Sequence, residues 1–161
     1  MEWVGFEVKG ALETADRYSL LERMQTSGSR RGVQLRGFAL GPNVELLLEG
    51  SPDEVGAAVA ATKMGTVQAA LHQGRSLTLG PTQRRRVADP SRALVQLHRG
   101  RGCPLENPWT SHRDLLGLRL ASFFDASQWR IDPRWVHVEA GGGALPVREA
   151  RERRPLDELL K

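Results

Sequence analysis

Two polar residues on one strand face are the first candidates for chemistry in this chain. The stretch Gly37–Gly50 contains a tight turn at Gly41-Pro42-Asn43 followed by alternating residues, which predicts two β-strands. Asn43 and Glu45 are two residues apart and therefore lie side by side on one face of the second strand. Their oxygens are ligands of the kind that Mg²⁺ and Mn²⁺ bind. The alternative is that Asn43 is simply a turn residue.

A second candidate is a group of three residues with side chains that bind transition metals. His98, Cys103 and His112 fall within fifteen residues. Zinc sites use four ligands, commonly with close pairs such as C-x-x-C, and this chain has neither the fourth ligand nor the pair. We therefore interpret these residues as a chance cluster on a polar surface, and we expect no metal and no cofactor. Phosphate-binding and hydrolase motifs of the G-x-x-x-x-G-K-[ST] and G-x-S-x-G types do not occur.

Arginine is concentrated in the segment from Arg75 to Arg119. Nine arginines stand there against three acids, so this segment is +6 and the remainder is −2, for a net charge of +4. Because arginine clamps phosphates and stacks on bases, the segment favours nucleic-acid binding. Arg84-Arg85-Arg86 could equally be a solvated edge strand protected by charge. The candidate nucleic-acid-binding residues are Arg75, Arg84, Arg85, Arg86, Arg99, Arg101 and Arg113.

Hydrophobic periodicity and turn residues predict the elements that must position these side chains. We expect strands at 3–8, 33–40, 44–50 and 83–87, and helices at 13–25, 52–72, 90–97 and 110–116. The leading order β-α-β-β-α-β is that of a ferredoxin-like α+β sandwich, an antiparallel sheet with helices on one face. Leu47 interrupts the polar face of its strand, so we expect that face to be half covered.

The chain fits one domain with an appended tail. We assign residues 1–120 to the domain and residues 121–140 to an extension with a strand at 135–138. Residues 141–161 are assigned to a flexible tail, with a short docking helix at 155–160. One cysteine, no signal-like start and no apolar run of about 20 residues predict a cytoplasmic protein without membrane contact.

Three stretches in the right order resemble the REP-associated tyrosine transposases, the single-tyrosine group of HUH nucleases. They are GFALGPNVELLLEG at 37–50, GRSLTLGPTQRRRV at 74–87 and NPWTSHRDLLG at 107–117. The resemblance covers about residues 3–117. It implies a ferredoxin-like nuclease fold that recognises DNA hairpins or single strands.

The chain departs from this family at the residues that perform its reaction. In the family, two histidines bind a metal and a tyrosine on the next helix attacks the phosphate. The histidine positions are here Asn43 and Glu45, and the tyrosine would fall near residues 63–67, where Thr66 offers only an unactivated alcohol. Tyr18, the only tyrosine, lies on the first helix and is interpreted as a core contact. The resemblance therefore implies a catalytically inactive protein.

Three functions follow from these observations. The first is a domesticated, regulatory transposase-like protein that retains binding of hairpin or single-stranded DNA. The second is a protein-interaction scaffold that uses a sheet edge or the C-terminal tail. The third, which we favour least, is a residual metal-dependent nuclease using Asn43 and Glu45. Family members often form dimers by exchanging the nucleophile-bearing helix, so a homodimer is a further option.

Overall fold

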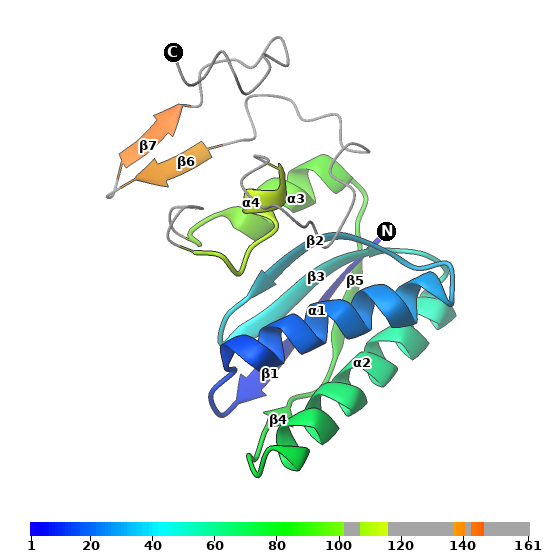
Figure 1. The fold of residues 1–161 in the computed structure, drawn as a ribbon. Coiled ribbons are helices and arrows are strands. Elements are labelled where there is room, and N and C mark those ends of the chain that lie inside the picture. Colours follow the sequence, from blue (N-terminus) through cyan, green and yellow to red (C-terminus); the bar gives the residue numbers. More distant parts are fainter. Residues whose placement is uncertain (102–106, 116–136, 141–142, 147–161) are drawn as a thin grey trace, which may run out of the picture.

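The computed structural model of the protein describes residues 1–101, 107–115, 137–140 and 143–146. It is an α+β structure with an antiparallel sheet of five strands (Figure 1). The strands are β1 (Glu2–Lys9), β2 (Gln34–Leu40), β3 (Asn43–Glu49), β4 (Thr78–Leu79), β5 (Gln83–Arg86), β6 (His137–Ala140) and β7 (Gly143–Pro146). The helices are α1 (Thr14–Ser29), α2 (Pro52–His72), α3 (Pro90–His98) and α4 (His112–Leu115).

Strand β1 lies inside the sheet and is paired along both of its edges. The strand order is β2-β3-β1, and β4 and β5 share the remaining edge of β1. In this edge, β5 pairs with Glu2–Gly5 and β4 pairs with Val8 and Lys9. The short interruption between β4 and β5 falls at Gly80-Pro81, where proline cannot donate to a strand ladder.

The first sheet face is covered by α1 and α2, which lie side by side against it (Figure 1). Alternation along β3 sends Val44, Leu46 and Leu48 into this core, where they are fully buried. The two helices contribute apolar side chains to the same cluster. These are Leu20, Leu21 and Met24 of α1, and Val55, Ala58, Val59 and Ala70 of α2.

The second sheet face is also covered by a helix, which corrects the prediction that helices lie on one face only. Helix α3 packs Ala93, Leu94 and Leu97 against Trp3 and Leu47. Leu47 is therefore completely buried, where the sequence predicted a half-covered position. The cover extends over only part of this face, because Asn43 remains exposed and Glu45 remains partly exposed.

The free edge of β2 is closed by the segment around Thr110. Ala39 and Thr110 form an antiparallel bridge, Leu40 N–H donates to the Trp109 carbonyl at 2.8 Å, and Ser111 N–H donates to the Phe38 carbonyl at 2.9 Å. These bonds satisfy backbone groups that would otherwise invite pairing with another chain. They cover residues 38–40 of the β2 edge, whereas the outer edge of β4 and β5 has no strand partner among the described residues.

Helix α2 has the bounds that its sequence predicts. Ser51 accepts a hydrogen bond from Glu54 N–H at 3.4 Å, and Pro52 occupies the first turn. Helix α1 instead continues to Ser29, beyond the predicted stop at Thr26-Ser27-Gly28. Gly28 lets the returning chain come close, since a Cβ there would lie 2.6 Å from the Val33 carbonyl oxygen.

The C-terminal described segments form a two-stranded sheet of β6 and β7. Strand β6 begins two residues later than predicted, and β7 lies inside the segment that the sequence assigns to a tail. Cys103 and the predicted helix at 155–160 lie outside the described residues. None of the helices that the structure describes has the length and apolar character needed to cross a membrane.

A buried ion pair ties the start of α1 to the chain that leaves α2. Asp16 is 2% exposed, and both its oxygens accept hydrogen bonds from Arg75, each at 2.7 Å. The same carboxylate accepts the Glu13 N–H at 3.0 Å, which caps the helix. The hydrogen bonds from Arg75 hold the pKa of Asp16 below its usual value. This pair therefore joins two elements 59 residues apart.

Replacing Asp16 with asparagine should lower the free energy of unfolding by about 1–3 kcal/mol, since it removes the buried carboxylate to which Arg75 donates two hydrogen bonds. The depressed pKa of Asp16 means that its stabilisation is present above about pH 4 and is lost as pH falls further. Urea unfolding of the parent and Asp16→Asn between pH 2.5 and 7 measures both effects.

The matched control is Glu13→Gln, whose exposed carboxylate lies 3.6 Å from Arg75 Nε. It should change stability by less than about 0.5 kcal/mol. If both variants lost the same free energy of unfolding, the two hydrogen bonds from Arg75 to Asp16 would contribute no more stability than the exposed contact with Glu13.

Candidate nucleic-acid interface

The structure places Asn43 and Glu45 on the second face of β3, as their spacing predicts. Glu45 is opposite Gly5 of β1, and Asn43 is opposite Glu7. The Glu45 carboxylate is ion-paired with the Arg101 guanidinium. This carboxylate therefore has a cationic partner in the place where the resemblance would position a metal.

Thr66, at the position corresponding to the family's nucleophile, is fully buried on the core side of α2. Its hydroxyl donates to the Thr62 carbonyl at 2.9 Å, a bond within the helix itself. The Thr66 oxygen is thus removed from solvent and already hydrogen-bonded. A phosphate in solution could not reach it without unfolding this part of α2.

His112 is buried and His98 is partly buried, which corrects their interpretation as part of a polar surface. Their rings stack with centroids 5.0 Å apart and an interplanar angle of 7°. His98 Nε2 lies 2.7 Å from Ser111 Oγ, and that oxygen also accepts the Phe38 N–H at 3.0 Å. Across the described residues, no group of three His, Cys, Asp or Glu side chains could hold a metal ion.

Ser111 Oγ and His98 Nε2 are as close as a serine nucleophile and its general base, but Ser111 cannot act as a nucleophile here. Ser111 is completely buried, so no substrate reaches its oxygen. Burial, with the neighbouring His112 ring, lowers the pKa of His98 to about 3, so the ring is neutral at neutral pH. The pair instead joins α3 to β2 and to the segment before α4.

Four of the candidate arginines have a carboxylate or an aromatic ring as a partner. Arg75 is bound to Asp16, Arg101 to Glu45, and Arg84 to Glu2 at 2.7 Å. Arg85 lies over the Trp3 ring, with its guanidinium carbon 4.2 Å from the ring centroid. Arg75 donates hydrogen bonds to both Asp16 and Gln73, so its role in the structure is to stabilise the fold.

Strand β5 consists of Gln83 and the consecutive arginines 84, 85 and 86, and all four residues are exposed. Alternation sends Arg84 toward the start of α2, where it also bonds the Pro52 carbonyl, and Arg85 toward the opposite face. Among the described residues, no carboxylate is paired with Arg85, Arg86 or Arg99. The structure thus presents unneutralised cations along the accessible edge of the sheet and just after α3.

Sequence reasoning missed a second cationic and aromatic group, at the start of α1. Trp109 meets Tyr18 edge to face with centroids 5.1 Å apart, and the Arg17 guanidinium lies 5.1 Å from the Trp109 centroid. Tyr18 is 49% exposed, so its interpretation as a core contact is wrong. Arg17 and Trp109 are 92 positions apart, and no local pattern signals their contact.

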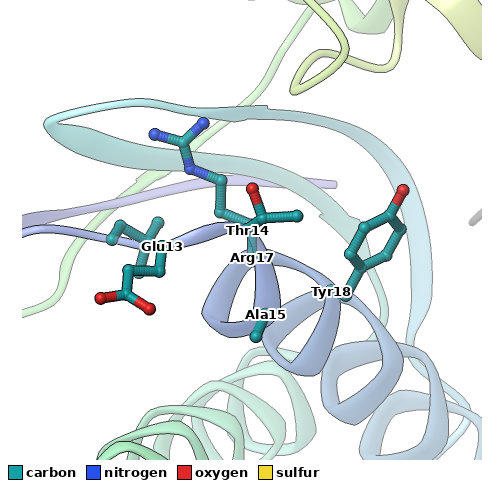
Figure 2. A pocket seen from close by; sticks show the side chains of 6 residues that line it. Glu13, Thr14, Ala15, Arg17 and Tyr18 are labelled. Atoms are coloured by element: carbon teal, nitrogen blue, oxygen red, sulfur yellow. The ribbon is translucent and has the colours of Figure 1, made fainter. Parts of the chain in front are cut away.

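This group borders an open depression of about 800 Å³. Figure 2 shows Arg17 and Tyr18 extending to the same side of α1, where they line it together with Glu13, Thr14 and Ala15. Desolvation by burial lowers the pKa of Arg17, and its Nε has no hydrogen-bond partner in the described part of the chain. Such a poorly hydrated cation beside an aromatic ring can contact an anion or stack on a base.

Arg113 is the remaining candidate and lies within α4, where it is partly buried. Its Nε is enclosed without a hydrogen-bond partner in the described residues. Its position on a short helix packed at the β2 edge separates it from the arginines of β5, which occupy the other edge of the sheet. The seven predicted arginines therefore do not form one continuous surface.

No protein-family model matches the chain, and no curated protein matches it either. The resemblance to the single-tyrosine transposases accordingly stays a prediction. The geometry of the described residues is what must distinguish the candidate functions.

Burial of neutral His98 predicts that the protein loses stability in mild acid. Because its folded pKa of about 3 lies below the usual 6.5, the unfolded chain binds a proton first as pH falls. The free energy of unfolding should therefore fall between pH 6.5 and pH 4.5, by up to about 1.4 kcal/mol per pH unit from this group. Urea unfolding at pH 7.0, 6.0 and 5.0 measures the slope.

His98→Gln removes the titrating ring and should flatten this slope, whereas His72→Gln, on an exposed residue at the end of α2, should leave it unchanged. A slope that is the same in His98→Gln as in the parent would mean that His98 does not titrate as its burial requires.

Proposed function

We propose that this chain is a catalytically inactive, transposase-like protein that binds hairpin or single-stranded nucleic acid. Along the chain, the elements follow the order β1-α1-β2-β3-α2, then β4 and β5. In the sheet, the strand order is β2-β3-β1, with β4 and β5 at the remaining edge of β1. Both orders support a ferredoxin-like sandwich. The single-tyrosine transposases that the sequence resembles share that fold. Helix α3 on the second face is an addition to that pattern.

The observation that carries the proposal is the exposed row of arginines on β5. Arg85 and Arg86 have no carboxylate partner among the described residues, and they follow one another on an accessible sheet edge. Arg85 is held over Trp3, so its guanidinium loses little freedom when it meets a phosphate. Planar guanidinium groups bind phosphate oxygens in a fork, which a backbone of regularly spaced phosphates can use repeatedly.

Loss of catalysis is supported by the two positions where the reaction would occur. Glu45 is neutralised by Arg101, and the Thr66 hydroxyl is buried and bonded within its helix. An alcohol needs an activating base to attack a phosphate, and the hydroxyl here already donates its proton to a carbonyl. Binding can persist without these groups because phosphate contacts depend on surface cations.

The competing scaffold function would use a sheet edge to add a strand from a partner protein. The β2 edge is already paired with the segment at Trp109–Ser111. The β5 edge is accessible but carries consecutive arginines, which discourage pairing with another strand and favour a polyanion. The described edges therefore favour nucleic acid over a protein strand.

Fluorescence anisotropy with labelled hairpin, single-stranded and duplex DNA tests the proposal across 25–200 mM salt. We expect binding to hairpin or single-stranded DNA that weakens steeply with salt, because each phosphate contact releases a counterion. Arg85→Gln with Arg86→Gln should reduce the slope of log K against log salt by about 1.5.

Arg23→Gln with Arg30→Gln is the matched control, since both are exposed cations on or just after α1 and away from β5. It removes the same charge and should keep the parent's slope. No binding to any probe at 25 mM salt would overturn the proposal, as would equal slopes in the two double variants.

Absence of catalysis has its own test in a nicking assay with Mn²⁺ and the hairpin probe. We expect no cleavage above background from the parent or from Glu45→Ala, because Glu45 is held by Arg101. Manganese-dependent cleavage by the parent that is lost in Glu45→Ala would restore the residual-nuclease function.

A further inference from the structure

The two arginines of β5 that lack a carboxylate partner have different surroundings, and only one of them lies on an aromatic ring. Arg85 is directly opposite Trp3 in the ladder between β5 and β1. Its guanidinium carbon is 4.2 Å from the centroid of the Trp3 ring, well inside the range of about 6 Å over which cations and aromatic faces attract each other. In the described part of the chain, Arg86 has neither a carboxylate partner nor a ring under its guanidinium.

The indole ring of Trp3 is a fixed support for the Arg85 guanidinium. Trp3 is 9% exposed and belongs to the buried cluster that α3 forms with the second face of the sheet. Its strand, β1, is paired along both edges, so the position of the ring is set by the sheet and by α3 together. Because Trp3 itself is almost completely buried, Arg85 is the member of this pair that meets solvent.

The shape of a guanidinium group determines what this pair can bind. The group is planar, with two flat sides and a rim of five N–H donors. One side of the Arg85 guanidinium lies against Trp3, so the other side is turned away from the ring. Guanidinium planes stack on unpaired nucleobases, and the donors on the rim can bind a phosphate oxygen at the same time. A lysine in this position would supply the charge without a flat side.

The neighbouring arginines of β5 are less suited to stacking. Arg84 extends to the other side of the strand, where it bonds Glu2 and the Pro52 carbonyl. Arg86 shares that side by alternation and has no ring to hold it in the described part of the chain. An unsupported arginine loses more side-chain freedom when a base stacks on it, which weakens binding. Arg85 is therefore the residue of this strand that is organised for stacking before a ligand arrives.

We propose that Arg85, supported by Trp3, is the base-stacking residue of this protein and that its ligand is an unpaired nucleobase beside a phosphate. This inference rests on the proposed nucleic-acid function and specifies which part of the nucleic acid β5 recognises. Bases inside a duplex are covered by their neighbours, so a stacking arginine selects single-stranded segments, loops and unpaired ends. Arg86 then contributes a phosphate contact that does not depend on the base.

Fluorescence anisotropy with two probes that carry the same phosphates tests the assignment. The first probe is a DNA hairpin with a single-stranded flank of about six adenines, and the second has abasic residues in place of those adenines. The parent should bind the adenine probe at least about fivefold more tightly, which is the lower end of what one stacked base contributes. Both probes should show the same dependence on salt, since they release the same counterions.

Three variants locate the stacking residue. Arg85→Lys keeps the charge but removes the flat side, so the preference for the adenine probe should fall below about twofold while the salt dependence is unchanged. Arg86→Lys is the matched control on the same strand and should keep the parent's preference. Trp3→Leu, with its fold checked by urea unfolding, should also reduce the preference, because Arg85 loses its support.

The outcomes separate this inference from the proposed function. Salt-dependent binding of both probes with equal affinity would overturn the inference and leave the proposed function intact, whereas no binding of either probe would overturn both. A preference that survives Arg85→Lys would assign stacking to another group, such as Tyr18 beside Trp109, and would overturn the role of Arg85. An unchanged preference in folded Trp3→Leu would overturn the supporting role of the ring.

Discussion

The packing of α3 against the second face of the sheet is the constraint on which the rest of the structure depends. Leu47 belongs to an inner strand and is completely buried, so its side chain must be covered from the face opposite α1 and α2. Leu94 and Leu97 provide that cover and come close to β2 at Gly37, where a larger residue would require these leucine side chains to shift. A Cβ there would lie 2.9 Å from Leu94 Cδ1 and 3.0 Å from Leu97 Cδ2.

This cover determines which polar groups stay accessible. Helix α3 brings His98 onto Ser111, and the segment containing Ser111 closes the edge of β2. The same helix leaves the far half of the face open, where Glu45 meets Arg101. Pairing with acids neutralises Arg75, Arg84 and Arg101. The arginines of this segment that have no carboxylate partner in the described residues are Arg85 and Arg86 on β5, Arg92 on α3, Arg99 just beyond α3, and Arg113 on α4.

Much of the fold follows from local patterns in the sequence. Strands β2 and β3 could be predicted because alternation and a tight turn are short-range signals, and α2 because Ser51 and Pro52 mark its start. The polar face of β3 was also predicted correctly, with Asn43 and Glu45 together. These features depend on residues that are neighbours in the chain.

The errors concern contacts between residues far apart in the chain. Arg75 is a structural ion pair because Asp16 lies 59 positions earlier, and nothing near Arg75 signals this. Tyr18 has the spacing of a core residue, but the group it contacts is Trp109 at the rim. His98 looks like a surface residue until α3 is known to cover the second face. A charged or aromatic residue alone does not reveal which partner the fold will supply.

Hydrogen–deuterium exchange of the protein with and without a hairpin oligonucleotide at low salt tests whether nucleic acid binds along β5. We expect slower exchange in Gln83–Arg86 and in the turn after α3 when the oligonucleotide is bound, with no change around Arg30, just after α1. Unchanged exchange in β5 at saturating oligonucleotide, or protection confined to other elements, would contradict it.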